Sequence, residues 1–456
     1  TRNNFSFLYS KFLVIYNDKF LSQSNTVLCT EFLVCYINPE YFGNFGYESQ
    51  ISGFFPVVLI TGPRQVGKTT VLEMCEKESR TKVSLDAFEI RELAQKDPRA
   101  FLNRYPAPVL IDEIQYAPQL FPYIKAIVDK EQQSGMYWLT GSQQFHLMKN
   151  VSESLAGRVG ILNLQGFSSA EKNNRPNTSA FLPTMDIIKE RRKNKKNLKN
   201  LYHFIWKGSY PALYLGDDKN WEMFYSSYVQ TYVERDVKQI TKIEDELMFM
   251  NFIRVLAAQT GQMLDYTSVA RDLGISVNTV KSWVSILLTS GLIYLLQPYY
   301  NNLTKRAIKT PKIYFMDTGL ACYLSMWNNA RALEVSAMAG AMFENYVISE
   351  IVKGYVNQGI DIRSRLCYYR DSNGKEIDLM IIENGKIYPI EIKKSAAPRD
   401  ATRNFSVLKP IEREPEADEF GAAHLKTAIG TGAVICMASD LIPIDRKNWY
   451  VPAWII

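Results

Sequence analysis

The segment that most constrains the fold is residues 57–70, where a short apolar run leads into a glycine-flanked loop and then a helix-forming stretch. Gly62 and Gly67 let the backbone turn with positive φ and come close to an anion. The N–H groups of the loop and the N-terminus of the following helix would then face phosphate groups. The spacing G-x-x-x-x-G-K-[ST] is that of the Walker A phosphate loop. The predicted loop consists of Gly62, Pro63, Arg64, Gln65, Val66, Gly67, Lys68, Thr69 and Thr70.

Two side chains of this loop have specific expected tasks. Lys68 would reach the β- and γ-phosphates, and the hydroxyl of Thr69 would bind Mg²⁺. The context fits, because β-forming residues precede the loop and residues 71–77 continue as a helix. We therefore expect ATP and Mg²⁺ as ligands.

A second motif follows at residues 108–113, where an apolar strand pattern ends in two carboxylates. In this Walker B form, Asp112 is expected to hold Mg²⁺ through water and Glu113 to activate the attacking water. Two adjacent acids after a strand are common by chance, but not at this distance from a phosphate loop. The pair predicts hydrolysis of ATP in addition to binding.

From residue 56 to about 165 the sequence alternates between strand and helix patterns. Such alternation predicts a parallel sheet covered by helices, with ligands at the carboxyl ends of the strands. An extra strand between the two Walker strands and a glutamate after the Walker B aspartate resemble the additional-strand, catalytic-glutamate branch of P-loop NTPases.

That resemblance implies further site residues. A polar residue at the end of the next strand senses the γ-phosphate in this branch, and Ser142 is our candidate, with Gln143 and Thr140 as alternatives. Arg158 is, by analogy, a charge-stabilising finger or sensor. An ordinary surface arginine is the alternative.

Composition limits the class of protein. The 456 residues are enough for two or three globular domains, and the net charge of +6 permits a nucleic-acid partner without requiring one. Six cysteines without CxxC spacing and only three histidines argue against a zinc site and for a reducing compartment. No apolar run approaches the ~18 residues of a membrane span, so we expect a soluble, cytoplasmic protein.

Two stretches after residue 165 carry less specific signals. Residues 189–199 are strongly basic and could track phosphates, although a charge run is more often a solvated loop. The helical stretch from 201 to about 260 places Tyr225, Tyr228, Tyr232 and Arg235 on one face, which favours a packing stripe over a site.

Residues 266–300 have the pattern of a helix-turn-helix followed by a wing. Thr267 can cap a helix that runs through Leu273, Gly274 makes the turn, and Ser276 caps a second helix. Residues 292–300 would form the wing. In the second helix, Val277, Val280, Val284 and Leu287 are expected inside and Asn278, Thr279, Lys281 and Ser282 outside. The outward residues would enter a DNA major groove, or the module would dock a protein partner.

A second charged constellation lies in a predicted hairpin. Asn384-Gly385 between two β-forming runs predicts a two-residue type I′ turn. In that register Asp378 lies opposite Glu391, and Lys393 lies opposite Glu376. Like charges opposite one another destabilise a sheet unless they are offset, and a divalent cation is one candidate. The alternative is a solvated face with a Glu376–Lys393 ion pair.

An Asp followed by Glu-x-Lys on the neighbouring strand resembles the PD-(D/E)xK nuclease core, where carboxylates bind Mg²⁺ and the lysine orients water or stabilises charge. Glu344, in a predicted helix upstream, fits the helix-borne acid of that core. The resemblance implies a second Mg²⁺ site formed by Glu344, Asp378 and Glu391 with Lys393. A nuclease fold can also persist without activity.

Taken together, the motifs GPRQVGKTT, VLIDEIQ, LTGSQ, SLAGR, FENYVISEI and EIDLMI…PIEIKK resemble a prokaryotic family of AAA-like, archaeal-ATPase-type proteins with a C-terminal domain of unknown function. The resemblance spans roughly residues 50–456. It implies an α/β fold in which a P-loop parallel sheet with helices on both faces precedes a helical, winged-helix domain and a restriction-endonuclease-like α/β domain. The expected units are an unassigned segment 1–50, an ATPase domain 51–170, a basic linker or insertion 171–200, a helical and winged-helix domain 201–330, and a nuclease-like domain 331–456.

Three functional hypotheses follow. The first is an ATP-hydrolysing, DNA-associated protein. The second is a nucleotide-dependent switch that docks a protein partner through its winged helix, and the third is an ATP-gated, Mg²⁺-dependent nuclease. Each is compatible with a homo-oligomer and needs no membrane.

Overall fold

The computed structural model describes residues 51–75, 79–142, 151, 153–173, 179–193, 198–214, 218–232, 246–299, 310–371, 373–408 and 428–456. Several expectations fall outside these residues. They concern the segment 1–50, Gln143, residues 194–197 of the basic block, Arg235 and Tyr300.

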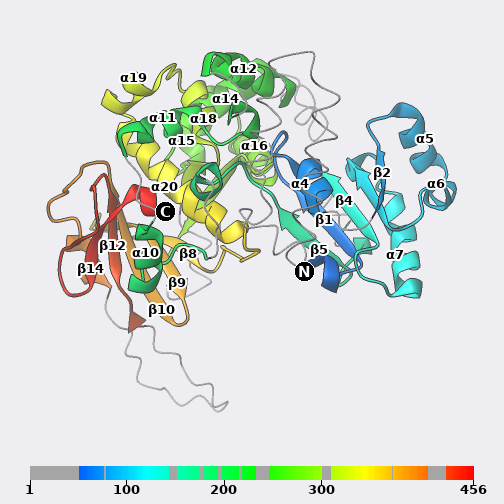
Figure 1. Cartoon of the computed structure of the whole chain (residues 1–456). Coiled ribbons are helices and arrows are strands. Elements are labelled where there is room, and N and C mark those ends of the chain that lie inside the picture. Colours follow the sequence, from blue (N-terminus) through cyan, green and yellow to red (C-terminus); the bar gives the residue numbers. More distant parts are fainter. Residues whose placement is uncertain are drawn as a thin grey trace, which may run out of the picture.

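A five-stranded sheet forms the amino-terminal lobe, at the right of Figure 1. All of its neighbouring strands pair in parallel. The strand order is β2 (Thr81–Ser84), β3 (Val109–Asp112), β4 (Tyr137–Gly141), β1 (Val57–Thr61) and β5 (Val159–Asn163). Strand β4 therefore lies between the two Walker strands β1 and β3, as the resemblance to the additional-strand branch implied.

Helices cover both faces of this sheet. As a result, alternate residues of β1 pack in two different hydrophobic clusters. Val57 and Leu59 pack in the cluster that contains residues of α5 (Phe88–Lys96), α6 (Pro98–Arg104) and α7 (Leu120–Glu131). Val58 and Ile60 pack in the cluster that contains residues of α4 (Lys68–Cys75) and continues into the rest of the molecule. A strand buried on both sides is expected to be apolar throughout, as β1 is.

A helical region lies next to this sheet and above the second one (Figure 1). Tyr225, Tyr228 and Tyr232 are all buried, so the predicted tyrosine stripe is confirmed as core packing over the described part of its helix. The helices outside the first sheet and the helix pair described next are α9 (Ser169–Lys172), α10 (Met185–Arg192), α11 (Leu201–Lys207), α12 (Trp221–Tyr232), α14 (Glu246–Ala258), α18 (Thr318–Leu324), α19 (Ala330–Val335) and α20 (Ala339–Val356).

The predicted helix pair is present as α15 (Tyr266–Leu273) and α16 (Val277–Thr289), joined through Gly274 at φ 67°. The expected cap of the first helix was wrong: Asp265, not Thr267, is the N-cap, and its carboxylate accepts hydrogen bonds from the N–H groups of Thr267 and Ser268. A carboxylate one position before the first turn reaches these amides directly. Ser276 caps α16 as expected, accepting from the Thr279 N–H at 3.0 Å.

The strand after α16 does not end in an isolated wing. Strand β6 (Ile293–Pro298) pairs antiparallel with β7 (Lys312–Phe315) and also pairs in parallel with β8 (Leu366–Arg370). Through these pairings, β6 and β7 join the nine-stranded sheet of the carboxyl-terminal lobe. The predicted limit between the last two domains lies after β7, so it separates these two strands from the rest of their sheet.

The remaining strands of this sheet follow β8 in space. Their order outward is β9 (Glu376–Glu383), β10 (Lys386–Lys393), β12 (Gly432–Cys436), β14 (Asn448–Pro452) and β13 (Ile442–Pro443), with β11 (Ala428–Ile429) beside β10. The β9–β10 hairpin has the predicted register, with Glu383 opposite Lys386, and Asn384 and Gly385 have φ of 50° and 70°. Positive φ at both positions is what a type I′ turn requires.

Candidate functional site

The phosphate loop connects the end of β1 to the start of α4. The backbone of the loop has a positive φ at three residues, with 142° at Gly62, 60° at Gln65 and 91° at Gly67. A Cβ at Gly62 would clash with the carbonyl oxygen of Leu164, which follows β5. Glycine is therefore required at this position for two reasons, its backbone angle and the close approach of the neighbouring chain.

Lys68 lies inside the turn of this loop. Its side chain is buried, and Nζ donates hydrogen bonds to the carbonyl oxygens of Gly62 at 3.2 Å and Pro63 at 2.9 Å. These contacts hold the ammonium against the concave side of the loop, where the predicted phosphates would bind.

The Walker B aspartate meets the first turn of α4. Thr69 Oγ1 donates to Asp112 Oδ1 at 3.2 Å, and the hydroxyl of Thr140, from the neighbouring strand β4, donates to the same oxygen. Thr140 also accepts from the N–H of Glu113 at 3.3 Å. Thr140 therefore positions both acids, a different task from the γ-phosphate contact for which it was an alternative candidate.

Glu113 has a left-handed backbone with φ 55°. Its Oε2 accepts from Nε2 of Gln115 and lies 3.5 Å from the hydroxyl of Ser142. Within the described residues, Oε1 of Gln115 is buried without a hydrogen-bond partner. Gln115 was not among the predicted site residues, and its place two residues after Glu113 is the signal in the sequence that marks it.

Ser142 lies where the sequence placed it. It follows β4 directly, is buried, and faces Glu113. The loop, the acidic pair and this serine therefore come together at one edge of the sheet.

Arg158 does not lie at that edge. It immediately precedes β5, which runs parallel to β1, and its carbonyl accepts from the N–H of Val57 at the amino end of β1. Its guanidinium pairs with Asp129 at the end of α7, with Nη2 to Oδ2 at 3.0 Å. Arg158 therefore lies at the opposite edge of the sheet from the phosphate loop and does not face the nucleotide site of its own chain. Its role as a charge-stabilising finger or sensor stays a prediction.

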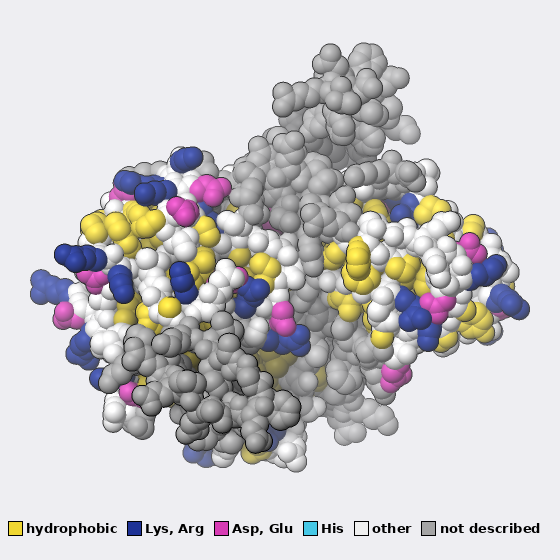
Figure 2. Space-filling model, turned by 90° about the horizontal axis from the view of Figure 1, so that it is seen from below, with side chains coloured by type: hydrophobic (Ala, Val, Ile, Leu, Met, Phe, Trp, Pro, Cys, Tyr) yellow, Lys and Arg dark blue, Asp and Glu magenta, His cyan; other side chains and the backbone are white. Residues whose placement is uncertain are grey.

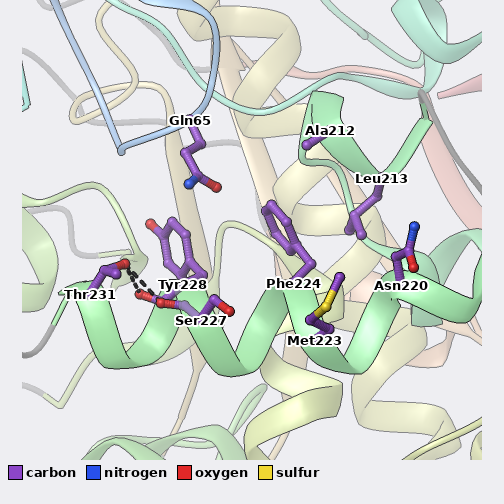
Figure 3. Close-up of a pocket in the computed structure, with 9 residues that line it drawn as sticks. All are labelled: Gln65, Ala212, Leu213, Asn220, Met223, Phe224, Ser227, Tyr228 and Thr231. Atoms are coloured by element: carbon purple, nitrogen blue, oxygen red, sulfur yellow. Dashed lines mark hydrogen bonds between the residues drawn. The ribbon is translucent and has the colours of Figure 1, made fainter. Parts of the chain in front are cut away.

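The phosphate loop contacts the helical region. Gln65 lines a cavity of about 310 Å³ whose other walls come from α12 and the turn before it, and Figure 3 shows Gln65 pointing toward Tyr228 and Phe224. On the other side, a Cβ at Gly291, after α16, would lie 3.2 Å from Cδ of Pro63. The cavity is lined by Gln65, Ala212, Leu213, Asn220, Met223, Phe224, Ser227, Tyr228 and Thr231.

The structure also brings together the carboxylates of the β9–β10 hairpin and of α20, but with lysines between them. Lys393 Nζ lies 2.6 Å from Glu391 Oε1 and 3.4 Å from Asp378 Oδ2. Glu376 pairs instead with Lys312 and with Arg370, so the alternative of a Glu376–Lys393 ion pair is wrong.

Burial and neighbouring charges shift the pKa values of this cluster. Burial raises the pKa of Glu391 to about 7, with a further increase from Asp378 that Lys393 opposes. Burial and Asp378 raise the pKa of Glu344 to about 6 against the opposing effects of Lys312 and Tyr314. Burial alone would lower the pKa of Lys312, but Glu344, Asp378 and Glu376 raise it above its ordinary value.

The predicted second Mg²⁺ site is not present as a set of ligands. Across the residues that the structure describes, no group of three or more His, Cys, Asp or Glu side chains is arranged to hold a metal ion. Lys312 was not among the residues predicted for this site. Its ammonium lies among the carboxylates of Glu344, Glu376 and Asp378.

In the amino-terminal lobe, the phosphate loop follows one strand of a parallel sheet, and the Asp-Glu pair follows the next strand but one. This arrangement defines the lobe as a P-loop NTPase of the additional-strand type. Residues 55–173 match the family model of the AAA domain, which supports ATP as the nucleotide of this lobe. Residues 198–331 and 339–456 match two models described as domains of unknown function, DUF8612 and DUF4143.

Two curated relatives cover most of the chain. A protein of Mycobacterium tuberculosis (strain ATCC 25618 / H37Rv), Uncharacterized protein Rv2008c, is 28% identical over 376 residues, which cover 81% of this chain and 77% of the relative. Uncharacterized protein MJ1637 of Methanocaldococcus jannaschii is 22% identical over 338 residues, with coverages of 64% and 66%.

Two solved structures are similar at low identity. The Walker-type ATPase PABY2304 of Pyrococcus abyssi has a TM-score of 0.38 at 14% identity and covers 61% of this chain and 93% of its own. AMPPCP-bound DnaA from Aquifex aeolicus has a TM-score of 0.27 at 14% identity, with coverages of 55% and 92%.

Within the described residues, none of the helices has both the length and the apolar character that crossing a membrane would require.

Proposed function

We propose that the amino-terminal lobe binds ATP with Mg²⁺ and hydrolyses it, and that the protein does so in association with DNA. One observation carries the ATPase part. A single edge of the sheet brings together side chains from the loop, from α4 and from the end of β3, namely Lys68, Thr69, Asp112 and Glu113. The Thr69 hydroxyl lies 3.2 Å from the Asp112 carboxylate.

The loop residues would bind the triphosphate. The Lys68 ammonium would exchange its contacts with the loop carbonyls for the β- and γ-phosphates, and the loop N–H groups would bind the same oxygens. The hydroxyl of Thr69 and the carboxylate of Asp112 are the ligand types that Mg²⁺ prefers, and they already lie together. The bound ion supplies positive charge against the phosphate oxygens.

Glu113 would act as the general base. A water molecule attacks the γ-phosphorus, the bond from this phosphorus to the β,γ-bridging oxygen breaks, and the proton of the water passes to the Glu113 carboxylate, leaving ADP and phosphate. Gln115 would hold this carboxylate in place as a positioning residue. We retain Ser142 as the γ-phosphate sensor, because its hydroxyl lies beside Glu113.

Phosphate release by the full chain tests this proposal. Glu113→Gln is expected to lower turnover by roughly 10²–10⁴-fold while ATP still binds. The matched control is Glu131→Gln at the exposed end of α7, which should release phosphate at the wild-type rate. Wild-type turnover in Glu113→Gln would contradict the assignment of Glu113 as the base.

The DNA part of the proposal is supported by the outer face of α16. Asn278, Lys281 and Ser282 are exposed there, while Val280 and Val284 are buried, so the second helix presents a polar stripe that the described residues leave exposed. On the face seen in Figure 2, Lys and Arg side chains are interspersed with acidic and apolar ones and form no continuous basic stripe among the described residues. We therefore propose a local contact through α16.

Fluorescence anisotropy with a labelled DNA duplex at rising salt tests this contact. Wild-type affinity should fall steeply with salt, and Lys281→Ala should weaken binding and reduce the salt slope by about 1. Lys130→Ala, which removes an exposed lysine from α7, is the matched control and should bind as wild type. No binding at low salt would favour the alternative function, a nucleotide-dependent switch that docks a protein partner through the same helix.

A further inference from the structure

The nuclease hypothesis requires a divalent cation between the acids of α20 and of the β9–β10 hairpin, so the surroundings of these acids decide it. Lys312, from β7, extends into this space, and its side chain is only 5% exposed. Its Nζ lies 2.5 Å from Glu376 Oε1, 3.1 Å from Glu344 Oε1 and 3.9 Å from Asp378 Oδ1. One ammonium thus faces carboxylates from two different elements, α20 and β9.

The second lysine closes the cluster from the side of β10. Lys393 Nζ contacts Glu391 Oε1 and Asp378 Oδ2, and the same Asp378 oxygen accepts from the N–H of Ile392 at 2.8 Å. Asp378 therefore lies between two ammonium groups, and each of its oxygens faces one of them. A metal ion bound by Asp378 would have to displace at least one lysine.

The cations of the chain can offset three of the four acids in this cluster. The acids Glu344, Glu376, Asp378 and Glu391 face the cations Lys312, Lys393 and Arg370, the last of which donates to Glu376 at 2.8 Å. Like-charged acids on neighbouring strands need an offsetting charge, and here the chain itself provides it. A divalent cation entering this space would meet the repulsion of a buried ammonium in a region of low dielectric constant.

We propose that Lys312 is a tethered counter-ion that takes the place of the divalent cation in this nuclease-like core. The cluster therefore binds no Mg²⁺, and the carboxyl-terminal module holds its acids for structural reasons and does not cut nucleic acid by a metal-dependent route. This inference is independent of ATP hydrolysis, because it concerns a different lobe and its tests need no nucleotide.

Binding of Mn²⁺ to the nucleotide-free full chain, followed by electron paramagnetic resonance, tests the inference directly. An Asp112→Asn background removes binding at the nucleotide site. In this background the parent should bind no Mn²⁺ at the cluster. Lys312→Met, which keeps most of the length of the side chain and removes its charge, should gain one Mn²⁺ site that the parent lacks.

Two controls make the result specific. Adding Asp378→Asn to Lys312→Met should abolish the gained site, and Lys386→Met, which removes an exposed lysine from the same hairpin, should gain none. Unchanged Mn²⁺ binding in Lys312→Met would overturn the proposal.

The parent protein provides a test that does not depend on the folding of Lys312→Met. If the parent binds Mn²⁺ and Asp378→Asn abolishes that binding, the proposal is wrong. Cleavage of plasmid or single-stranded DNA by the wild type in Mg²⁺ or Mn²⁺ without ATP, lost in Asp378→Asn, would contradict it equally. We expect no such cleavage in either protein.

Discussion

Glu391 shows, at the scale of a residue, how position in a fold changes the chemistry of a side chain. Its side chain is buried, and within the described residues its Oε2 has no hydrogen-bond partner. Burial and the neighbouring acid raise the pKa of Glu391 to about 7, so the folded protein favours the protonated carboxyl. The contribution of this group to stability is therefore greatest below its ordinary pKa of 4.5 and is lost as the pH rises toward 7.

Glu391→Gln should remove this dependence. We expect the variant to be more stable relative to wild type at pH 8 than at pH 4.5, with a free energy of unfolding that is larger by roughly 1–3 kcal/mol. Urea denaturation at the two pH values measures it. A difference between the proteins that does not change with pH would contradict the raised pKa.

The residues found from sequence alone are those whose task follows from a short motif. Lys68, Thr69, Asp112 and Glu113 are fixed by their places relative to two strands, and the structure brings them together. Lys312 could not be found in this way, because 66 residues separate it from Asp378 and only the pairing of β6 with β7 and β8 brings the two side chains together. No local pattern marks a lysine as the counter-ion of a distant hairpin.

At the scale of elements, the buried junction between α9 and α20 connects the two lobes. Glu350, on α20, accepts from the N–H of Ser169 and lies 3.7 Å from Lys172 and 3.1 Å from Lys353. Burial would raise the pKa of Glu350, but the two lysines and the N–H group lower it below its ordinary value. This carboxylate therefore stabilises the junction in its ionised form.

Glu350→Ala would leave two buried lysines without this partner. We expect the free energy of unfolding at neutral pH to fall by roughly 3–5 kcal/mol, the usual cost of breaking a buried ion pair from one side. The matched control is Glu334→Ala on α19, where the side chain is exposed, and its midpoint in urea should stay at the wild-type value. Equal midpoints in urea for Glu350→Ala and wild type would show that Glu350 does not stabilise the junction.

Secondary-structure elements were predictable where a short sequence fixes the backbone geometry. The Asn384-Gly385 turn fixes the register of β9 and β10, which is as predicted. The place of Arg158 follows from the same geometry, because a residue just before a parallel strand lies at the amino edge of the sheet, away from ligands at the carboxyl edge. The cap of α15 was misplaced because Asp265 and Thr267 are both good capping residues and only the backbone decides between them.

At the scale of the whole molecule, one hydrophobic cluster runs through both lobes. It includes Val58 and Ile60 of β1, Leu256 of α14, and residues as far along the chain as Trp454 and Ile456. The domain limits that we proposed therefore divide a chain whose core is shared. The sequence could not indicate this, because periodicity shows which face of a strand is apolar but not which distant element covers it.

A shared core predicts that the lobes unfold together. Differential scanning calorimetry of the full chain should show one main transition. A nonhydrolysable ATP analogue with Mg²⁺ at 100 times its dissociation constant should stabilise that whole transition by about 2.7 kcal/mol. Two separate transitions, of which the nucleotide shifts only one, would contradict a shared core.

The most direct test of the central claim is equilibrium binding of a fluorescent ATP analogue to the full chain, compared between Lys68→Ala and Lys130→Ala. The first variant removes the buried ammonium from the phosphate loop, and the second removes an exposed one from α7. We expect Lys68→Ala to bind roughly 10–100-fold more weakly than wild type, the usual loss for a hydrogen bond to a charged group, and Lys130→Ala to bind as wild type. Wild-type affinity in Lys68→Ala would show that the loop between β1 and α4 does not hold the triphosphate.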